Sequence, residues 1–132
     1  NESQGERSVE RGLHELGLPF EREKKFAACR NINPLPFDFY IFDNKGGVVI
    51  ECHGEQHYRP VPFWGGMGAF QKRVMLDGIK KKFCEDRGIQ YVEISYGKSL
   101  ASIRKILSAK FPKKNEMNTF QKIEIFLFYI HF

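Results

Sequence analysis

Two carboxylates stand within strand-like, apolar runs of the sequence. Asp38 lies between two phenylalanines in PFDFYIFD, and Glu51 follows two valines and an isoleucine in GVVIECHG. A buried carboxylate is costly unless a cation or hydrogen-bond donors compensate its charge. If the two side chains meet, they could hold a divalent cation such as Mg²⁺. The alternative is that both face solvent on a one-sided sheet.

The segment between these two runs, Asn44-Lys45-Gly46-Gly47, predicts a hairpin turn. If Lys45-Gly46 is a two-residue turn, Asp38 lies opposite His53. Glu51 is then a diagonal neighbour of Asp38 on the same face, about 7–8 Å away at Cα. A slip of one residue would instead place the two carboxylates on opposite faces.

Two histidines follow Glu51 at short range. His53 and His57 lie in ECHGEQH, and histidine titrates near neutral pH, which suits a general base. His57 could equally be a surface histidine of a loop. A zinc site of Cys52, His53 and His57 is a further alternative, although strand alternation should point Cys52 away from the face that carries Glu51.

Two acidic residues on predicted helices complete the candidate set. Glu6 follows Ser3 at capping-box spacing, so a structural role explains it fully. Asp77 lies opposite an apolar stripe that runs from Met75 to Phe83, and a solvated helix face explains that position equally well.

The hydrophobic pattern around these residues predicts three helices and four strands. Helices are expected at 3–18, 69–87 and 99–110, an edge strand at 20–26, a loop at 29–36, the two strand-like runs around Asp38 and Glu51, and a strand at 90–96. The order α-β-β-β-α-β-α predicts an α/β fold in which helices flank a mixed sheet.

The length of 132 residues suits one domain. We assign residues 1–112 to it and expect 113–132 to be a C-terminal tail of uncertain structure. Residues 113–121 are polar enough for a linker, and 123–132 form either a final buried strand or an apolar tail. Because the chain begins with Asn1 and not with Met, we expect it to be a fragment of a longer protein.

Charge and cysteine content narrow the expected partners and compartment. A formal charge of +5 favours a polyanionic partner over an acidic one. Three separated cysteines without a CxxC pair suit the cytoplasm or another reducing intracellular compartment. We expect no membrane association and no small-molecule organic cofactor, and the oligomeric state stays open.

The segment PLPFDFYIFDNKGGVVIECHGEQHY and the later DGIKKKFCEDRGIQYVEISY together resemble the core of the PD-(D/E)xK nuclease superfamily. The resemblance is closest to the branch of very-short-patch repair endonucleases and EDxHD homing endonucleases of phages, and it covers residues 3–96. It implies a restriction-endonuclease-like fold and a metal-dependent DNA endonuclease that nicks or fully cleaves duplex DNA. Mg²⁺, or alternatively Mn²⁺, would be its cofactor.

Matched residue by residue, the resemblance implies a site made of Glu6, Asp38, Glu51, His57 and Asp77. Asp38 and Glu51 would be the metal ligands, and His57 would be the general base. Glu6 and Asp77 would orient water or His57, or complete a metal site. The lysine that the wider superfamily carries two residues after the acidic strand residue is here His53, which could line the site, contact phosphate or fill the space of the lysine.

Binding to DNA would come from basic residues that flank this centre: Arg59, Lys72, Arg73, Lys80 and Lys81. The aromatic loop from Tyr58 to Trp64 could wedge between bases or pack as a lid over the sheet. Three other readings stay open: a non-catalytic nucleic-acid-binding module of the same fold, an RNA nuclease, and a structural α/β domain whose candidate residues do not converge.

Overall fold

The computed structural model describes residues 2–112 and 119–131. Its elements are α1 (Gln4–Glu15), β1 (Glu21–Arg30), β2 (Pro34–Ile41), β3 (Val48–His53), α2 (Gly66–Arg87), β4 (Gln90–Ser95), α3 (Leu100–Lys110) and α4 (Thr119–His131). Two short 3₁₀ turns, η1 (Glu55–His57) and η2 (Pro62–Trp64), lie between β3 and α2. Through residue 112, the order of helices and strands is the predicted one.

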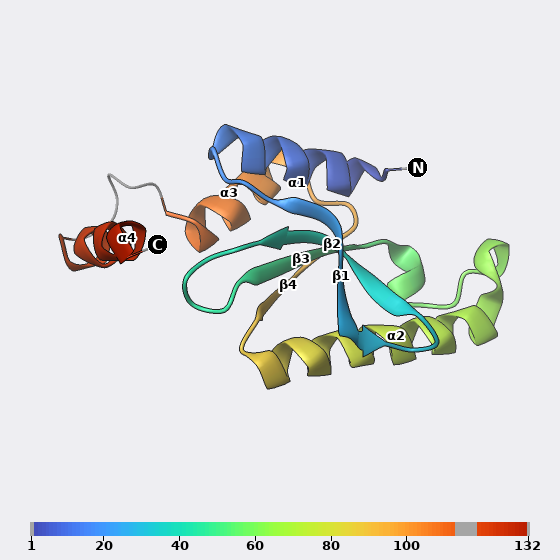
Figure 1. The fold of residues 1–132 in the computed structure, drawn as a ribbon. Helices are drawn as coiled ribbons and strands as arrows, with labels where there is room; N and C mark the ends of the chain where they lie inside the picture. Colours follow the sequence, from blue (N-terminus) through green and yellow to red (C-terminus); the bar gives the residue numbers. More distant parts are fainter. Residues whose placement is uncertain (1, 113–118, 132) are drawn as a thin grey trace.

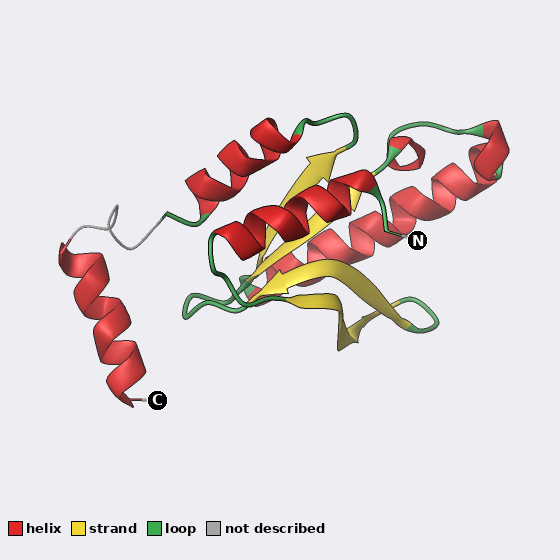
Figure 2. Ribbon diagram, turned by 90° about the horizontal axis from the view of Figure 1, so that it is seen from above, coloured by secondary structure: helices red, strands yellow, loops and turns green. Residues whose placement is uncertain are grey.

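The four strands form one open, mixed sheet in the order β1-β2-β3-β4. β1 pairs antiparallel with β2, and β2 with β3, whereas β3 and β4 run parallel. Helix α2 covers one face of the sheet, and α1 and α3 cover the other (Figures 1 and 2). The prediction of a mixed sheet flanked by helices is therefore confirmed, including the edge position of β1.

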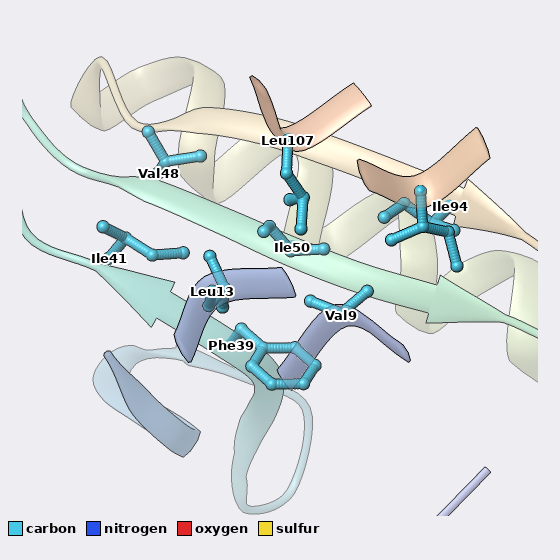
Figure 3. Packing of buried hydrophobic residues seen from close by; sticks show 9 residues of the cluster. Val9, Leu13, Phe39, Ile41, Val48, Ile50, Ile94 and Leu107 are labelled. Carbon is cyan, nitrogen blue, oxygen red and sulfur yellow. The ribbon is translucent and has the colours of Figure 1, made fainter. Parts of the chain in front are cut away.

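The main hydrophobic core lies between the sheet and the pair α1 and α3 (Figure 3). Val9 and Leu13 of α1 and Leu107 of α3 pack there against strand residues such as Ile50. A Cβ atom on Gly12 would lie 2.5 Å from a methyl carbon of Leu107, so glycine lets the two helices approach closely. Ser3 caps α1 with the predicted capping box.

A second core lies under α2 and is built largely from aromatic residues and thiols. Phe83 packs there beside Phe37 and Phe26, with ring centroids 5.3–6.5 Å apart. Its buried members are Cys29, Phe37, Val49, Phe83 and Cys84. The two cores fix β2 and β3 from both faces, and these are the strands that carry Asp38 and Glu51.

The connection between β2 and β3 differs from the predicted two-residue turn. Ile41 pairs with Val48, so six residues connect the strands and the register is displaced by two residues. The cause is Asp43, whose Oδ1 accepts hydrogen bonds at 2.8 Å from the backbone N–H of Lys45 and of Gly47. An even displacement would by itself preserve the side-chain faces, but the pairing of β2 with β3 ends at Phe39 and Ile50, before Asp38 and Glu51.

Two other predicted boundaries are wrong. The expected loop at 29–36 is mostly strand, because β1 runs to Arg30 and β2 begins at Pro34 after a register shift in β1. The C-terminal stretch is helical at Thr119–His131, which excludes a strand there; most of the predicted linker at 113–121 lies outside the described residues. None of the described helices is long and apolar enough to cross a membrane.

Candidate active site

Asp38 lies at a kink in β2. Regular alternation would place Phe37 and Phe39 on one face, yet Phe37 packs in the core under α2 and Phe39 in the core under α1 and α3. Pairing of β2 with β3 extends only as far as Phe39 and Ile50. The backbone of Asp38 is thus released from the sheet ladder, and its polar groups need other partners.

Side chains supply those partners. The backbone N–H of Asp38 donates to Glu51 Oε1 at 2.8 Å, and its carbonyl accepts from Arg22 Nε at 3.1 Å. In return, Asp38 Oδ2 accepts the backbone N–H of Cys52 at 2.7 Å. The two predicted carboxylates are therefore brought together, and each bonds to the backbone of the opposite strand.

The second oxygen of Glu51 bonds to Lys80, which the sequence predicts at the DNA-binding surface. Lys80 Nζ lies 2.9 Å from Glu51 Oε2, and Lys80 is only 7% exposed. Its ammonium also lies 5.3 Å from the centroid of the Phe37 ring. The expectation of Lys80 as an exposed cation is wrong, because α2 turns it inward as the counter-ion of a buried carboxylate.

The same helix face carries Asp77, one turn before Lys80. Asp77 is 8% exposed and Met75 is 48% exposed, so the solvated-face interpretation of Asp77 is wrong. Asp77 and Lys80 share a face with the core residue Phe83 at intervals of three residues. The spacing of Asp77 and Lys80, three residues apart and in line with Phe83, was the sequence signal that could have identified Lys80 as an inward-facing residue.

His57 and Asp77 form a close pair. His57 Nδ1 lies 2.8 Å from Asp77 Oδ2, and the His57 ring stacks on His53 with centroids 3.9 Å apart. His53 Nε2 in turn lies 3.9 Å from Glu51 Oε2. A continuous row of polar groups thus runs from Asp38 through Glu51 and the two histidines to Asp77.

Glu93 of β4 holds the outer edge of His53, a role that the sequence did not indicate. Its Oε1 lies 3.4 Å from His53 Nδ1, and its Oε2 accepts the hydroxyl of Tyr58 at 2.6 Å. Lys81, expected to bind DNA, extends to the same carboxylate at 3.3 Å while more than half of its side chain stays exposed. Glu93 reaches the site because β4 pairs in parallel with β3, placing Glu93 beside Glu51.

Glu6 approaches Asp38 from the start of α1. It closes the capping box through Oε2 and bonds to Arg22 at 2.9 Å through Oε1. Glu6, Glu23 and Asp38 offer one oxygen each within 4.8 Å of one another. Among the described residues, Glu23 is the one non-glycine residue with positive φ, at 53°.

The electrostatic states of these carboxylates differ. Burial, and next the charge of Glu51, raise the pKa of Asp38 to about 7. Burial also acts to raise the pKa of Glu51, but the His53 ring and the Lys80 ammonium outweigh it and lower that pKa. Burial of Asp77 is likewise outweighed, by its hydrogen bond to His57, so its pKa is lowered. Of the three, Asp38 has the greatest need of a cation.

A large cavity of about 840 Å³ opens beside His53, the member of this row that lines it. It lies at the N-termini of α1 and α3 and at the C-terminal ends of β3 and β4, and its lining includes Glu6, His53, Trp64, Tyr96 and Lys98. A second, smaller cavity of about 250 Å³ is lined by Arg59 and Arg73 among others.

The aromatic loop does not close over the sheet. Phe63 is 88% exposed and Trp64 is 52% exposed, so the lid interpretation is wrong for the tip of this loop. Lys72 is exposed, and Arg59 is exposed while it donates to the hydroxyl of Tyr96 at 2.8 Å. Apolar and cationic groups therefore lie side by side at this end of α2.

Cys52 does not join the histidines. It packs at the edge of the core under α1 and α3, as strand alternation predicts for a neighbour of Glu51. A zinc site that combines Cys52 with His53 and His57 is therefore not assembled.

Comparison with known proteins found no matching family model, curated relative or solved structure.

Proposed function

We propose that this chain is a metal-dependent endonuclease that hydrolyses DNA phosphodiester bonds, built on a restriction-endonuclease-like variant of the mixed α/β sheet. The observation that carries the proposal is the His57–Asp77 pair, which the tertiary fold brings into one row with Asp38 and Glu51. These residues come from β2, β3, η1 and α2. A structural domain has no need to collect buried carboxylates and histidines from four elements into one row beside His53, which lines the large cavity.

The carboxylates near Asp38 fit Mg²⁺. Asp38, Glu6 and Glu23 offer oxygen donors, which this hard cation prefers. The raised pKa of Asp38, caused by burial and then by the charge of Glu51, indicates a negative charge that lacks compensation. Asp38 is therefore the first ligand that we assign. Glu51 can join only by giving up its bond to Lys80, so we assign it a less direct role than the resemblance implies.

A bound Mg²⁺ would polarise the scissile phosphate and stabilise the oxyanion leaving group. His57 would accept the proton of the attacking water. In the neutral tautomer with the proton on Nδ1, His57 donates to Asp77 and leaves Nε2 free to accept that proton. Asp77 is a positioning residue, because it fixes the tautomer and stabilises the imidazolium that forms.

Lys80 supplies the positive charge that the wider superfamily places at the position of His53. From α2 it reaches Glu51 at 2.9 Å, while His53 fills the strand position between Glu51 and His57. A cationic side chain would thus be present in the active site, although it comes from α2 and not from the strand position that carries lysine in the wider superfamily.

The DNA would lie against the end of α2 and the cavity beside His53. Arg59, Lys72 and Arg73 offer phosphate contacts there. Phe63 and Trp64 expose apolar surface at the same end, which suits contact with bases opened from the stack.

The test is nicking of supercoiled plasmid with Mg²⁺ or Mn²⁺ compared with EDTA. We expect metal-dependent cleavage that falls by at least about 100-fold in His57→Ala and Asp38→Asn, the range of a lost general base or metal function. His14→Ala is the matched control, because His14 makes an edge-to-face contact with Phe20 and lies outside the row. Full activity in His57→Ala, or no cleavage of DNA by the unaltered chain, would refute the proposal. Matched RNA duplexes in the same assay test the RNA nuclease alternative.

A further inference from the structure

The pair His57–Asp77 has a third member, and the three side chains form a donor set distinct from the carboxylates near Asp38. His53, His57 and Asp77 each offer one ligand atom, and these atoms lie within 4.8 Å of one another. They come from β3, η1 and α2, so the set exists only in the folded chain. The neighbouring thiol of Cys52 is not part of it.

One oxygen of this set has no partner. Asp77 Oδ2 bonds to His57, but Asp77 Oδ1 is buried and has no hydrogen-bond partner among the described residues. Asp77 as a whole is 8% exposed. Buried carboxylate oxygens without partners are rare, and a bound cation is one arrangement that satisfies such an oxygen.

The chemistry of the donors selects a class of ion. Two imidazoles and one carboxylate favour Zn²⁺ and its first-row neighbours, whereas Mg²⁺ prefers oxygen donors alone. Ligand atoms about 2.1 Å from a tetrahedral ion lie roughly 3.4 Å apart. The His57 and Asp77 donors lie 2.8 Å apart and all three lie within 4.8 Å of one another, so side-chain rotations would have to complete the site, and the ion would replace the proton between His57 and Asp77.

On its Nδ1 side, His53 has the surroundings of a metal-bound histidine, whereas its Nε2 lies 3.2 Å from the hydroxyl of Tyr91, which an ion on Nε2 would displace. Glu93 Oε1 lies 3.4 Å from His53 Nδ1, and a carboxylate behind the ring commonly fixes the orientation of a ligating imidazole. Tyr58 and Lys81 hold Glu93 in place in turn. The set therefore has a supporting contact as well as ligands.

We propose that His53, His57 and Asp77 bind one first-row transition-metal ion, with Zn²⁺ preferred over Mg²⁺. A second consequence rests on the proposed function. Because the ion occupies His57, it prevents His57 from acting as a base, so Zn²⁺ inhibits cleavage while Mg²⁺ supports it at the carboxylates near Asp38. The same histidine thus serves catalysis or metal binding, but not both at once.

Titration of the full chain with Co²⁺, followed by its visible absorption, tests the site without any cleavage assay. We expect one equivalent of Co²⁺ to bind per chain and to give the absorption spectrum of nitrogen and oxygen ligands. Zn²⁺ should displace this Co²⁺, and excess Mg²⁺ should not. His57→Ala and Asp77→Asn should bind at least about 100-fold more weakly, and Glu93→Gln about 10-fold more weakly, as for the loss of a supporting contact. His14→Ala is the matched control and should bind Co²⁺ normally.

Three results would overturn the site: no Co²⁺ binding, binding unchanged in both His57→Ala and Asp77→Asn, or a sulfur-to-cobalt charge-transfer band that identifies a cysteine ligand. Far-UV circular dichroism shows that each variant is folded, and His57→Gln replaces any variant that is not. The two proposals fail separately. If the chain binds Co²⁺ but does not cleave DNA, only the proposed nuclease function is refuted. If the chain cleaves DNA with Mg²⁺, is not inhibited by Zn²⁺ and binds no Co²⁺, only the proposed metal site is refuted.

Discussion

Replacing Lys80 with methionine tests the ion pair at the centre of the candidate site. Methionine keeps most of the apolar stem of Lys80 and removes only the ammonium. Glu51, whose side chain is 3% exposed, then stays buried without its closest cation. Loss of one partner of a buried pair typically costs about 3–5 kcal/mol. Because Glu51 keeps the N–H of Asp38 and the nearby His53 ring, we expect the lower end, about 3 kcal/mol.

The loss should depend on pH with a defined sign. Burial acts to raise the pKa of Glu51, but the opposite effect of His53 and Lys80 is larger. The pKa of Glu51 therefore lies below its ordinary value. A carboxylate with a lowered pKa adds stability above the pKa of the unfolded chain, and this stability is lost as pH falls through the folded pKa. The difference between the unaltered chain and Lys80→Met should therefore be largest at neutral pH and shrink in acid, where Glu51 is protonated.

Urea unfolding followed by far-UV circular dichroism measures the difference in the free energy of unfolding. Lys82→Met is the matched control: Lys82 lies on the same helix and also has a 2.9 Å ion pair, to Asp86, but both side chains are more than half exposed. We expect no measurable loss in the control. The double variant Lys80→Met, Glu51→Gln should recover most of the stability, because no unpaired charge stays buried. A loss below about 1 kcal/mol in Lys80→Met, the range of an exposed pair, would refute the reasoning.

Other substitutions test the remaining parts of the structure. Asp38→Asn should stabilise the chain by up to about 4 kcal/mol at pH 8 and leave it unchanged near pH 3. The reason is that burial and the charge of Glu51 raise the pKa of Asp38 to about 7, so the unaltered chain loses folding stability as pH rises through that value. Equal free energies of unfolding of Asp38→Asn and the unaltered chain at pH 8, measured with urea, would contradict this. Ser3→Ala should cost about 1 kcal/mol through loss of the helix cap, and an unchanged urea midpoint would argue against the cap. If the chain binds DNA as proposed, Arg73→Ala should reduce the salt dependence of duplex binding, with the slope of log K against log salt falling by about 0.9. Fluorescence anisotropy without divalent ions measures that slope, and an unchanged slope would remove Arg73 from the interface.

Much of the secondary structure follows from local sequence. The cap at Ser3, the left-handed glycine Gly88 after α2 and the apolar periodicity of the helices are signals within one turn of chain. The turn after β2 was mispredicted because a side chain, Asp43, takes backbone hydrogen bonds that a standard hairpin turn would leave to the ladder. Residue types alone do not rank these two solutions.

The sequence by itself determined that Asp38 and Glu51 would be costly to bury, because both carboxylates stand among apolar residues of strand-like runs. It did not determine how the two meet, because β2 kinks at Asp38 and its pairing with β3 ends at Phe39 and Ile50. Only the tertiary structure decided what compensates them. Lys80 pairs with Glu51 across 29 residues of chain, and Asp77 pairs with His57 across 20 residues. The physical reason is that the rotation of α2 over the sheet is set by packing of the whole second core, including Phe83 and Phe37. That rotation turns a lysine and an aspartate inward, and the spacing of both in line with Phe83 is the only trace of it in the local sequence of α2.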